Sequence, residues 1–133
     1  MTMNKLCPCG SNRDFNDCCE LIISAKRDAT TCQELMRSRY VAFTTANIDY
    51  LMRSHHSETR PVKELQQIKK WAQSVQWMGL VILNTQGGKV EDSMGYVEFQ
   101  ALYLEDGQMQ QIHEKSLFKR ESQRWVYVSG VHY

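Results

Sequence analysis

The sequence predicts an α+β fold in which three helices come first and a four-strand antiparallel meander follows. Apolar residues recur at helical spacing between residues 31 and 75, and at every second position after Gln76. The segments that separate the alternating runs are short enough to form hairpins. A third pattern, four cysteines in the turn-rich stretch 7–19, predicts a zinc knuckle at the N-terminal end.

The three expected helices cover about 31–46, 47–52 and 59–75. Residues 28–31 offer side chains suited to cap the first helix, and Pro61 is well tolerated in the first turn of the third. One face of the first helix is apolar and consists of Leu35, Met36, Tyr40, Phe43 and Ala46. We expect this face to pack on the sheet.

The four expected strands cover about 77–84, 94–104, 109–119 and 124–129. In the second strand, every other residue is apolar, and the set consists of Val97, Phe99, Ala101 and Tyr103. Because alternate residues of a strand share one face, we expect this set to face the helices.

Composition and charge exclude several classes of protein. The 133-residue chain has 16 Lys and Arg against 15 Asp and Glu, and no run of like charges marks a nucleic-acid arm or a membrane anchor. The longest apolar run, 78–83, is too short to cross a bilayer, and the first residues lack the apolar core of a signal peptide. We therefore expect a cytoplasmic protein with no membrane or nucleic-acid partner, in a compartment where thiols stay reduced.

Four cysteines are predicted to hold one structural Zn²⁺: Cys7, Cys9, Cys18 and Cys19. Gly10 can adopt the positive φ that folds the chain back after the first pair. Adjacent side chains diverge by roughly 100° on a helix but point to opposite faces of a strand, so we expect a helical turn at 14–19. Zinc would supply folding free energy that this turn-rich stretch cannot obtain from burial.

The alternative for Cys18 and Cys19 is that one or both pack as small apolar residues. A redox pair is less favoured, because the sequence lacks a C-x-x-C segment. Cys32 lies on the apolar face of the first helix and is expected in the core. We divide the chain into the knuckle and its docking segment at 1–27 and the main domain at 28–133.

The cysteine pattern resembles the SEC-C motif, named for the C-terminus of the SecA preprotein translocase. It begins with CPCGS at 7–11 and ends with the adjacent pair at 18–19. Later segments, such as LMRSRYVAF at 35–43 and HEKSLF at 113–118, resemble the YchJ-type family of bacterial proteins. That resemblance implies a SEC-C knuckle joined to a nuclear-transport-factor-two-like, or SnoaL-like, cone, in which helices pack into a strongly curved sheet.

The resemblance leaves two classes of function open. In the first, the zinc knuckle is an adaptor that docks on a protein partner, as the SEC-C knuckle of the translocase docks on a secretion chaperone. In the second, the cone binds a small molecule or has a lyase- or isomerase-like activity, as in SnoaL-like proteins. Fold alone does not choose between them. We favour the adaptor over an enzyme, because the zinc motif is the more specific signal.

Six residues are candidates to line a cavity in the cone: Tyr40, Phe43, Trp71, Glu114, Ser116 and Tyr127. A carboxyl group in such a cavity could act as a general acid or base, so Glu114 and its neighbour His113 are the catalytic candidates. As alternatives, Glu114 could pair with Arg37 or Arg39, or the inward and outward faces of the strand could be exchanged, which would leave the carboxylate solvated. The aromatic candidates also suit ordinary core packing.

Both faces of the first and last expected strands carry apolar residues. In 77–83, one set consists of Trp77, Val81 and Leu83, and the other of Met78, Leu80 and Ile82. A sheet with one face in water needs only one such set, so the second set predicts a cover. We expect a homodimer through the outer face of the sheet. The alternative is that the knuckle, with residues 21–23, folds over that face within one chain.

Overall fold

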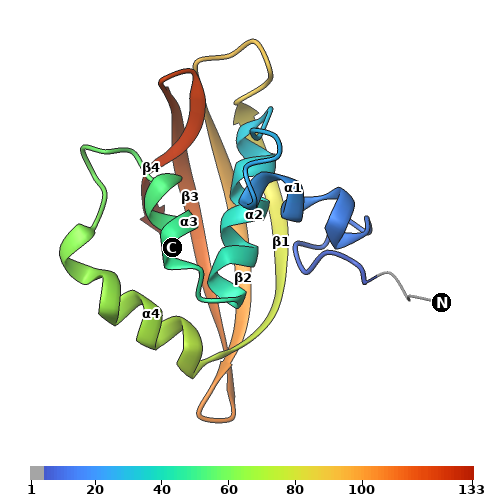
Figure 1. The fold of residues 1–133 in the computed structure, drawn as a ribbon. Coiled ribbons are helices and arrows are strands. Elements are labelled where there is room, and N and C mark those ends of the chain that lie inside the picture. The colour runs from blue at the N-terminus through green and yellow to red at the C-terminus, as the bar shows by residue number, and fades with distance from the viewer. Residues whose placement is uncertain (1–4) are drawn as a thin grey trace.

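The computed structural model of the chain describes residues 5–133. Helices pack on one face of a curved antiparallel sheet, which confirms the predicted α+β class (Figure 1). The helical elements are η1 (Phe15–Asp17), α1 (Cys19–Ile23), α2 (Cys32–Thr44), α3 (Ile48–Arg53), η2 (Val62–Glu64) and α4 (Leu65–Ser74). The strands are β1 (Gln76–Gly87), β2 (Met94–Glu105), β3 (Gln108–Glu121) and β4 (Arg124–His132). Within residues 5–133, no helix has the length and hydropathy needed to cross a membrane.

The strands follow one another in the order β1-β2-β3-β4, joined by hairpins as the alternating pattern predicts. The turn between β2 and β3 consists of Asp106 and Gly107, with φ values of 52° and 77°. Ser122 and Gln123 form the turn between β3 and β4, with φ values of 52° and 70°. Positive φ at both central residues matches the right-handed twist of the flanking strands. The strands extend to these turns and are therefore longer than expected.

A β-bulge in β1 changes which residues point inward. The register of β1 against β2 shifts between Trp77 and Gly79, and an extra residue moves the following side chains to the opposite face. The predicted faces of this strand are therefore wrong beyond Trp77. The residues that pack against the core are Trp77, Leu80 and Ile82, whereas Met78, Val81 and Leu83 are 44% to 46% exposed.

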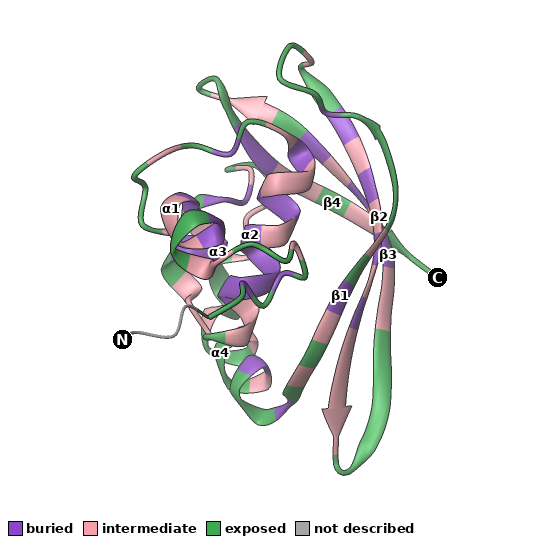
Figure 2. Ribbon diagram, turned by 90° about the vertical axis from the view of Figure 1, so that its right-hand side faces the viewer, coloured by how far each residue is buried: buried purple, intermediate pink, exposed green. Residues whose placement is uncertain are grey.

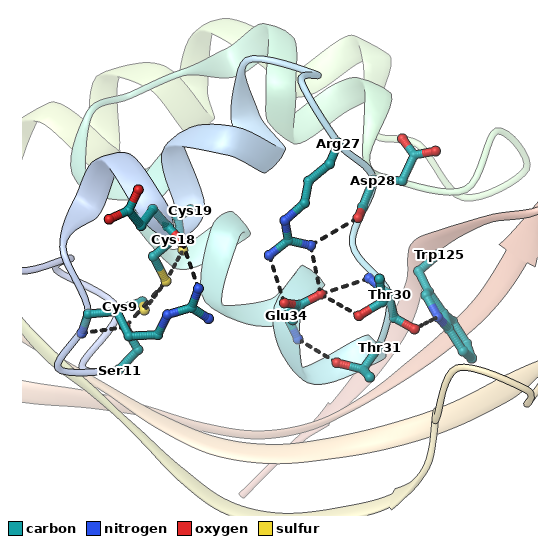
Figure 3. Close-up of polar contacts among 12 residues, drawn as sticks. Cys9, Ser11, Cys18, Cys19, Arg27, Asp28, Thr30, Thr31, Glu34 and Trp125 are labelled. Carbon is teal, nitrogen blue, oxygen red and sulfur yellow. Dashed lines mark hydrogen bonds and ion pairs between the residues drawn. The ribbon is translucent and has the colours of Figure 1, made fainter.

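Helix α2 begins where the sequence predicts its cap. The side chain of Thr31 accepts a hydrogen bond from the backbone N–H of Glu34 at 3.2 Å. The Glu34 carboxylate in turn accepts the backbone N–H of Thr30 and pairs with Arg27, both at 2.8 Å (Figure 3). These contacts hold the segment before the helix against its first turn. The buried residues of α2 are Cys32, Leu35, Met36, Ser38, Arg39, Tyr40, Val41 and Ala42 (Figure 2).

Cys32 lies in the core, as the sequence predicts, and packs against the turn that follows β1. Its backbone N–H donates to the carbonyl oxygen of Gly88 at 3.0 Å. A Cβ at Gly88 would overlap the Cys32 sulfur, and Gly88 has a φ of 71°. Only glycine meets both conditions without strain.

Other parts of the chain cover both edges of the sheet. At the β4 edge, Tyr127 donates its N–H to the carbonyl oxygen of Ser54, and His56 donates its N–H to the carbonyl oxygen of Tyr127. At the β1 edge, the knuckle turn at Gly10 approaches the carbonyl oxygen of Leu80. The knuckle therefore lies beside α2 and the β1 edge. The alternative in which it covers the outer face of the sheet is wrong (Figure 2).

Helix α4 carries an apolar face that is only half-buried. Leu65, Ile68, Trp71 and Ala72 share one side of this helix at helical spacing, but only Ala72 is fully buried. Figure 1 shows α4 set apart from the sheet. Two half-buried side chains of this face, Ile68 and Trp71, line a cavity, which is described below.

Candidate functional site

Four buried cysteine sulfurs form a cluster in the knuckle. The Sγ atoms of Cys7, Cys9, Cys18 and Cys19 all lie within 4.8 Å of one another. The Sγ of Cys18 is 3.7 Å from that of Cys9 and 4.0 Å from that of Cys19 (Figure 3). A tetrahedral zinc ion with Zn–S bonds near 2.3 Å holds its sulfurs about 3.8 Å apart. The donor set and its spacing therefore fit one such ion.

A tight turn positions the first pair of cysteines. Gly10 and Asn12 have φ values of 84° and 64°, which reverse the chain after Cys9. The backbone N–H of Cys7 then donates to the carbonyl oxygen of Arg13 at 2.8 Å. The reversal that the sequence predicts at Gly10 is thus present.

A backbone break positions the second pair. The 3-10 helix η1 ends at Asp17, and α1 begins at Cys19. Between them, Cys18 has a φ of −127° and a ψ of −115°, which lies outside the helical region. The predicted helical turn at 14–19 is therefore interrupted at Cys18. The interruption allows both adjacent sulfurs to join the cluster.

Hydrogen bonds among the thiols favour a thiolate in the cluster. Hydrogen bonds to Cys7 and Cys9, together with burial, raise the pKa of Cys19. Hydrogen bonds from Cys19 and Cys7 lower the pKa of Cys9. The hydroxyl of Ser11 lies 3.3 Å from the Sγ of Cys18 (Figure 3). Thiolates are the metal-binding form, and among Cys7, Cys9 and Cys19 these contacts favour it only at Cys9.

One arginine connects the cluster to the rest of the protein. Arg37 on α2 donates from Nη1 to the carbonyl oxygen of Cys9 at 2.5 Å. Ile22 of α1 and Leu35 of α2 are buried in the same core. These contacts dock the knuckle on α2, so an ordered knuckle stabilises the docked arrangement and docking in turn stabilises the knuckle.

The second candidate site is a cavity of about 430 Å³ between α2, α4 and the sheet. Most of its lining is apolar or aromatic and consists of Met36, Tyr40, Phe43, Leu51, Met52, Pro61, Ile68, Trp71, Trp77, Phe99, Ala101 and Ile112. The polar residues of the lining are Arg39, His55, Glu64, Glu114, Tyr127 and His132. This size and this composition are typical of small-molecule sites.

Aromatic rings surround Trp77, and all of them except Tyr103 form one wall of the cavity. The distances from its ring centre are 5.9 Å to Tyr40, 5.9 Å to Phe43, 5.3 Å to Trp71 and 5.6 Å to Tyr103. The indole N–H of Trp77 donates to the carbonyl oxygen of Ala72 at 3.1 Å, which fixes the ring. Edge-to-face and tilted contacts of this kind stabilise an aromatic cluster.

Glu114 is buried in the polar part of the cavity. Its Oε2 accepts hydrogen bonds from the hydroxyls of Ser116 at 2.5 Å and Tyr127 at 2.8 Å, and its Oε1 lies 3.1 Å from Nε2 of His132. The backbone of Gly130 closes another side, because a Cβ there would overlap the carboxylate. Among the described residues, hydroxyls and a histidine satisfy this carboxylate, and neither Arg37 nor Arg39 forms an ion pair with it.

Arg39 is a buried cation of the cavity. Its Nη1 donates to the carbonyl oxygen of Leu51 at 2.9 Å and to the hydroxyl of Ser54 at 2.7 Å. The guanidinium carbon lies 4.6 Å from the centre of the Tyr127 ring, a cation–π distance. Burial lowers the pKa of Arg39 to about 10, so the side chain is still charged at neutral pH.

Family comparisons agree with this arrangement. Residues 31–130 match the family described as YchJ, middle NTF2-like domain. This chain belongs to the YchJ family. Residues 3–21 match the SEC-C motif, and this segment contains all four cysteines of the cluster. The resemblance read from the sequence is therefore confirmed.

The chain spans about four fifths of the length of two curated relatives. It is 41% identical over 128 residues to a UPF0225 protein of Geobacter sulfurreducens, covering 96% of this chain and 80% of the relative. It is also 41% identical over 131 residues to a UPF0225 protein of Photorhabdus laumondii, covering 97% and 82% of the two chains.

Two solved structures share this fold. The solution structure of a SEC-C motif containing protein from Rhodopseudomonas palustris has a TM-score of 0.85 and 30% identity, covering 97% of this chain and 98% of the other. The crystal structure of a SEC-C motif containing protein from Psychrobacter arcticus has a TM-score of 0.81 and 23% identity, covering 94% and 81%. The second likeness extends to the fold alone.

Most of the residues that the sequence predicts for the YchJ cavity line it in the structure: Tyr40, Phe43, Trp71, Glu114 and Tyr127. Ser116 lies behind this surface and contributes through its bond to Glu114. His113 occupies the opposite face of β3, where its Nε2 is 2.7 Å from the carboxylate of Glu98. His113 therefore does not share the cavity with Glu114.

Four polar residues of the lining were not predicted from the sequence: Arg39, His55, Glu64 and His132. Gly130, whose backbone packs on the Glu114 carboxylate, was not predicted either. The centre of the His55 ring lies 4.9 Å from the centre of the Tyr127 ring. Gly130 and His132 lie beyond the predicted end of the last strand. A glycine within a strand often marks a close approach of other atoms. Gly130 was therefore the one sequence feature that could have indicated this contact with Glu114.

Proposed function

We propose that Cys7, Cys9, Cys18 and Cys19 bind one structural zinc ion, and that the zinc-bound knuckle is a docking element for a protein partner. The observation behind this proposal is the buried cluster of four sulfurs at spacings that suit a tetrahedral ion. A closed set of four thiolates leaves no position for substrate, which is typical of structural zinc. The ion then stabilises the knuckle that presents the docking surface.

Metal analysis tests the zinc proposal. We expect one zinc per chain in protein purified without chelators, and loss of the ion in a Cys18→Ser, Cys19→Ser double variant. Cys32→Ala is the matched control, because Cys32 is equally buried but lies outside the cluster. Zinc retained by the double variant, or absent from the parent, would contradict the proposal.

The docking proposal rests on the exposed surface of the knuckle. Leu6 is 60% exposed next to the cluster, and Pro8 between the first two ligands is exposed as well. In an affinity capture with zinc-loaded protein, we expect Leu6→Asp to lose a partner that the parent retains. Val62→Asp, at a residue 58% exposed on η2, is the matched control. Identical partners for all three proteins would contradict an adaptor role.

The cavity supports a second candidate function, the binding of a small molecule or a lyase- or isomerase-like reaction. The specific observation is a hydrogen-bonded carboxylate, Glu114, inside a largely apolar cavity. Such convergence of a few polar groups in an apolar pocket is the usual form of a ligand site. Ala101→Leu should fill the cavity and abolish ligand-induced thermal stabilisation, while Leu6→Asp should leave that stabilisation unchanged.

A further inference from the structure

Arg39 has hydrogen-bonding capacity that the described part of the chain does not use. The side chain is only 6% exposed, and both of its hydrogen bonds are made by Nη1. Within residues 5–133, no carboxylate forms an ion pair with it. Every fully buried side-chain nitrogen and oxygen in this part of the chain has a partner. The remaining guanidinium nitrogens are therefore not fully buried, and Arg39 is one of the residues that line the cavity.

Glu114 differs from Arg39 in this respect. Both of its oxygens already have partners, and the Gly130 backbone packs against the carboxylate. Tyr127 links the two charged groups, since its ring faces the guanidinium and its hydroxyl binds Glu114. The unused polar capacity is therefore cationic. Glu114 is near enough to stabilise the charge of Arg39, but among the described residues no carboxylate contacts the guanidinium, and a buried charge without such a contact is costly.

We propose that the cavity binds a small apolar carboxylate, whose carboxylate group is held by the free nitrogens of Arg39. A guanidinium presents parallel N–H donors that match the two oxygens of a carboxylate. The body of the ligand lies against the aromatic wall formed by Tyr40, Phe43, Trp71 and Trp77. The inference rests on the small-molecule function proposed above and names its ligand class.

The cavity also limits the shape of this ligand. A volume of about 430 Å³ lies at the smaller end of the range for small-molecule sites and has room for one ring and a short side chain. Ala101 and Ile112 contribute further apolar lining. These residues favour an aromatic or branched body over a polar one.

A matched pair of ligands tests the inference on the intact, zinc-loaded protein. The pair is 3-phenylpropanoate and its uncharged amide, which differ in the group that meets Arg39. Binding is measured by calorimetry and by quenching of Trp71 and Trp77, both of which line the cavity. We expect the acid to bind on the order of tenfold tighter than the amide, as hydrogen bonds to charged groups imply. If the parent protein bound the acid and the amide with equal affinity, the inference would be overturned before any variant was tested.

Two variants assign the preference to a residue. In Arg39→Gln the ratio of affinities should fall to about one. Arg53→Gln is the matched control, because Arg53 also stacks on a tyrosine ring but lies outside the cavity lining. A preference that persists in Arg39→Gln would overturn the role of Arg39. Failure of both ligands to bind would instead remove the small-molecule function on which the inference rests.

Discussion

The guanidinium of Arg37 holds the carbonyl oxygen of Cys9, 28 positions earlier in the chain, at 2.5 Å. This contact joins a cysteine of the cluster to the central helix of the cone. It therefore links the order of the knuckle to the stability of the main domain.

Arg37→Met should loosen the knuckle without removing its metal. Hydrogen bonds to charged groups contribute about 1.5 to 3 kcal/mol, so we expect a loss of that order in the free energy of unfolding. Hydrogen exchange should become faster in α1 than in β2. Arg13→Met is the control, because the exposed Arg13 bonds only within the knuckle, to the carbonyl oxygen of Asp17. Equal exchange in the two variants would refute a docking role for Arg37.

Gly130→Ala should destabilise the protein by about 1 to 3 kcal/mol, because the new Cβ would overlap the Glu114 carboxylate. Glu114→Ala should cost about 1 to 3 kcal/mol, since it leaves the hydroxyls of Ser116 and Tyr127 without their acceptor. In the double variant the overlap disappears, so the two losses should not add. Denaturant unfolding of all four proteins measures this coupling, and strict additivity would contradict it.

Because of His55, the free energy of unfolding should decrease as the pH is lowered from 6.5 to 4. Burial, with the nearby charges of Arg39 and Arg60, lowers the pKa of His55 from 6.5 to about 4. Between these values the unfolded chain binds a proton that the folded chain does not, so the free energy of unfolding decreases as the pH falls from 6.5 to 4. The decrease is at most about 3 kcal/mol.

Unfolding measured at several pH values checks this prediction. His55→Gln should show a shallower decrease than the parent between pH 6.5 and 4. His56→Gln is the control, since His56 is the adjacent residue and is less buried. A slope that is the same in the parent and in His55→Gln would assign the effect to other groups.

The homodimer through the outer face of the sheet stays a prediction, now with corrected residues. The exposed apolar side chains of β1 are Met78, Val81 and Leu83, and the knuckle does not cover them (Figure 2). Apolar patches on a sheet face favour a symmetric contact with a second copy. Light scattering should give about 31 kDa, twice the chain mass of 15.5 kDa.

Charge placed on that face should separate the copies. We expect Val81→Glu to reduce the mass to that of one chain, and Val62→Glu on η2 to leave it unchanged. A single-chain mass for the parent at micromolar concentration would remove the dimer.

The cysteine cluster could be predicted from sequence because its geometry is local. All four cysteines lie between positions 7 and 19, and a positive φ at Gly10 is enough to bring the first pair round. The order of helices and strands is equally local, since periodicity and turn residues act over a few positions. For the same reason, the capping role of the segment before α2 was predictable from Thr31.

The cavity and its polar groups were decided by tertiary structure. Glu114 on β3 meets Tyr127 and His132 only because β4 pairs with β3. An extra residue of β4, opposite the step from Leu117 to Phe118, shifts the register there. The bulge in β1 likewise reversed faces that the alternating pattern predicts. Arg37 contacts the knuckle and Arg39 lines the cavity because of the way α2 is rotated against its neighbours. Such choices are settled by packing between distant segments, whose energies a pattern of adjacent residues does not contain.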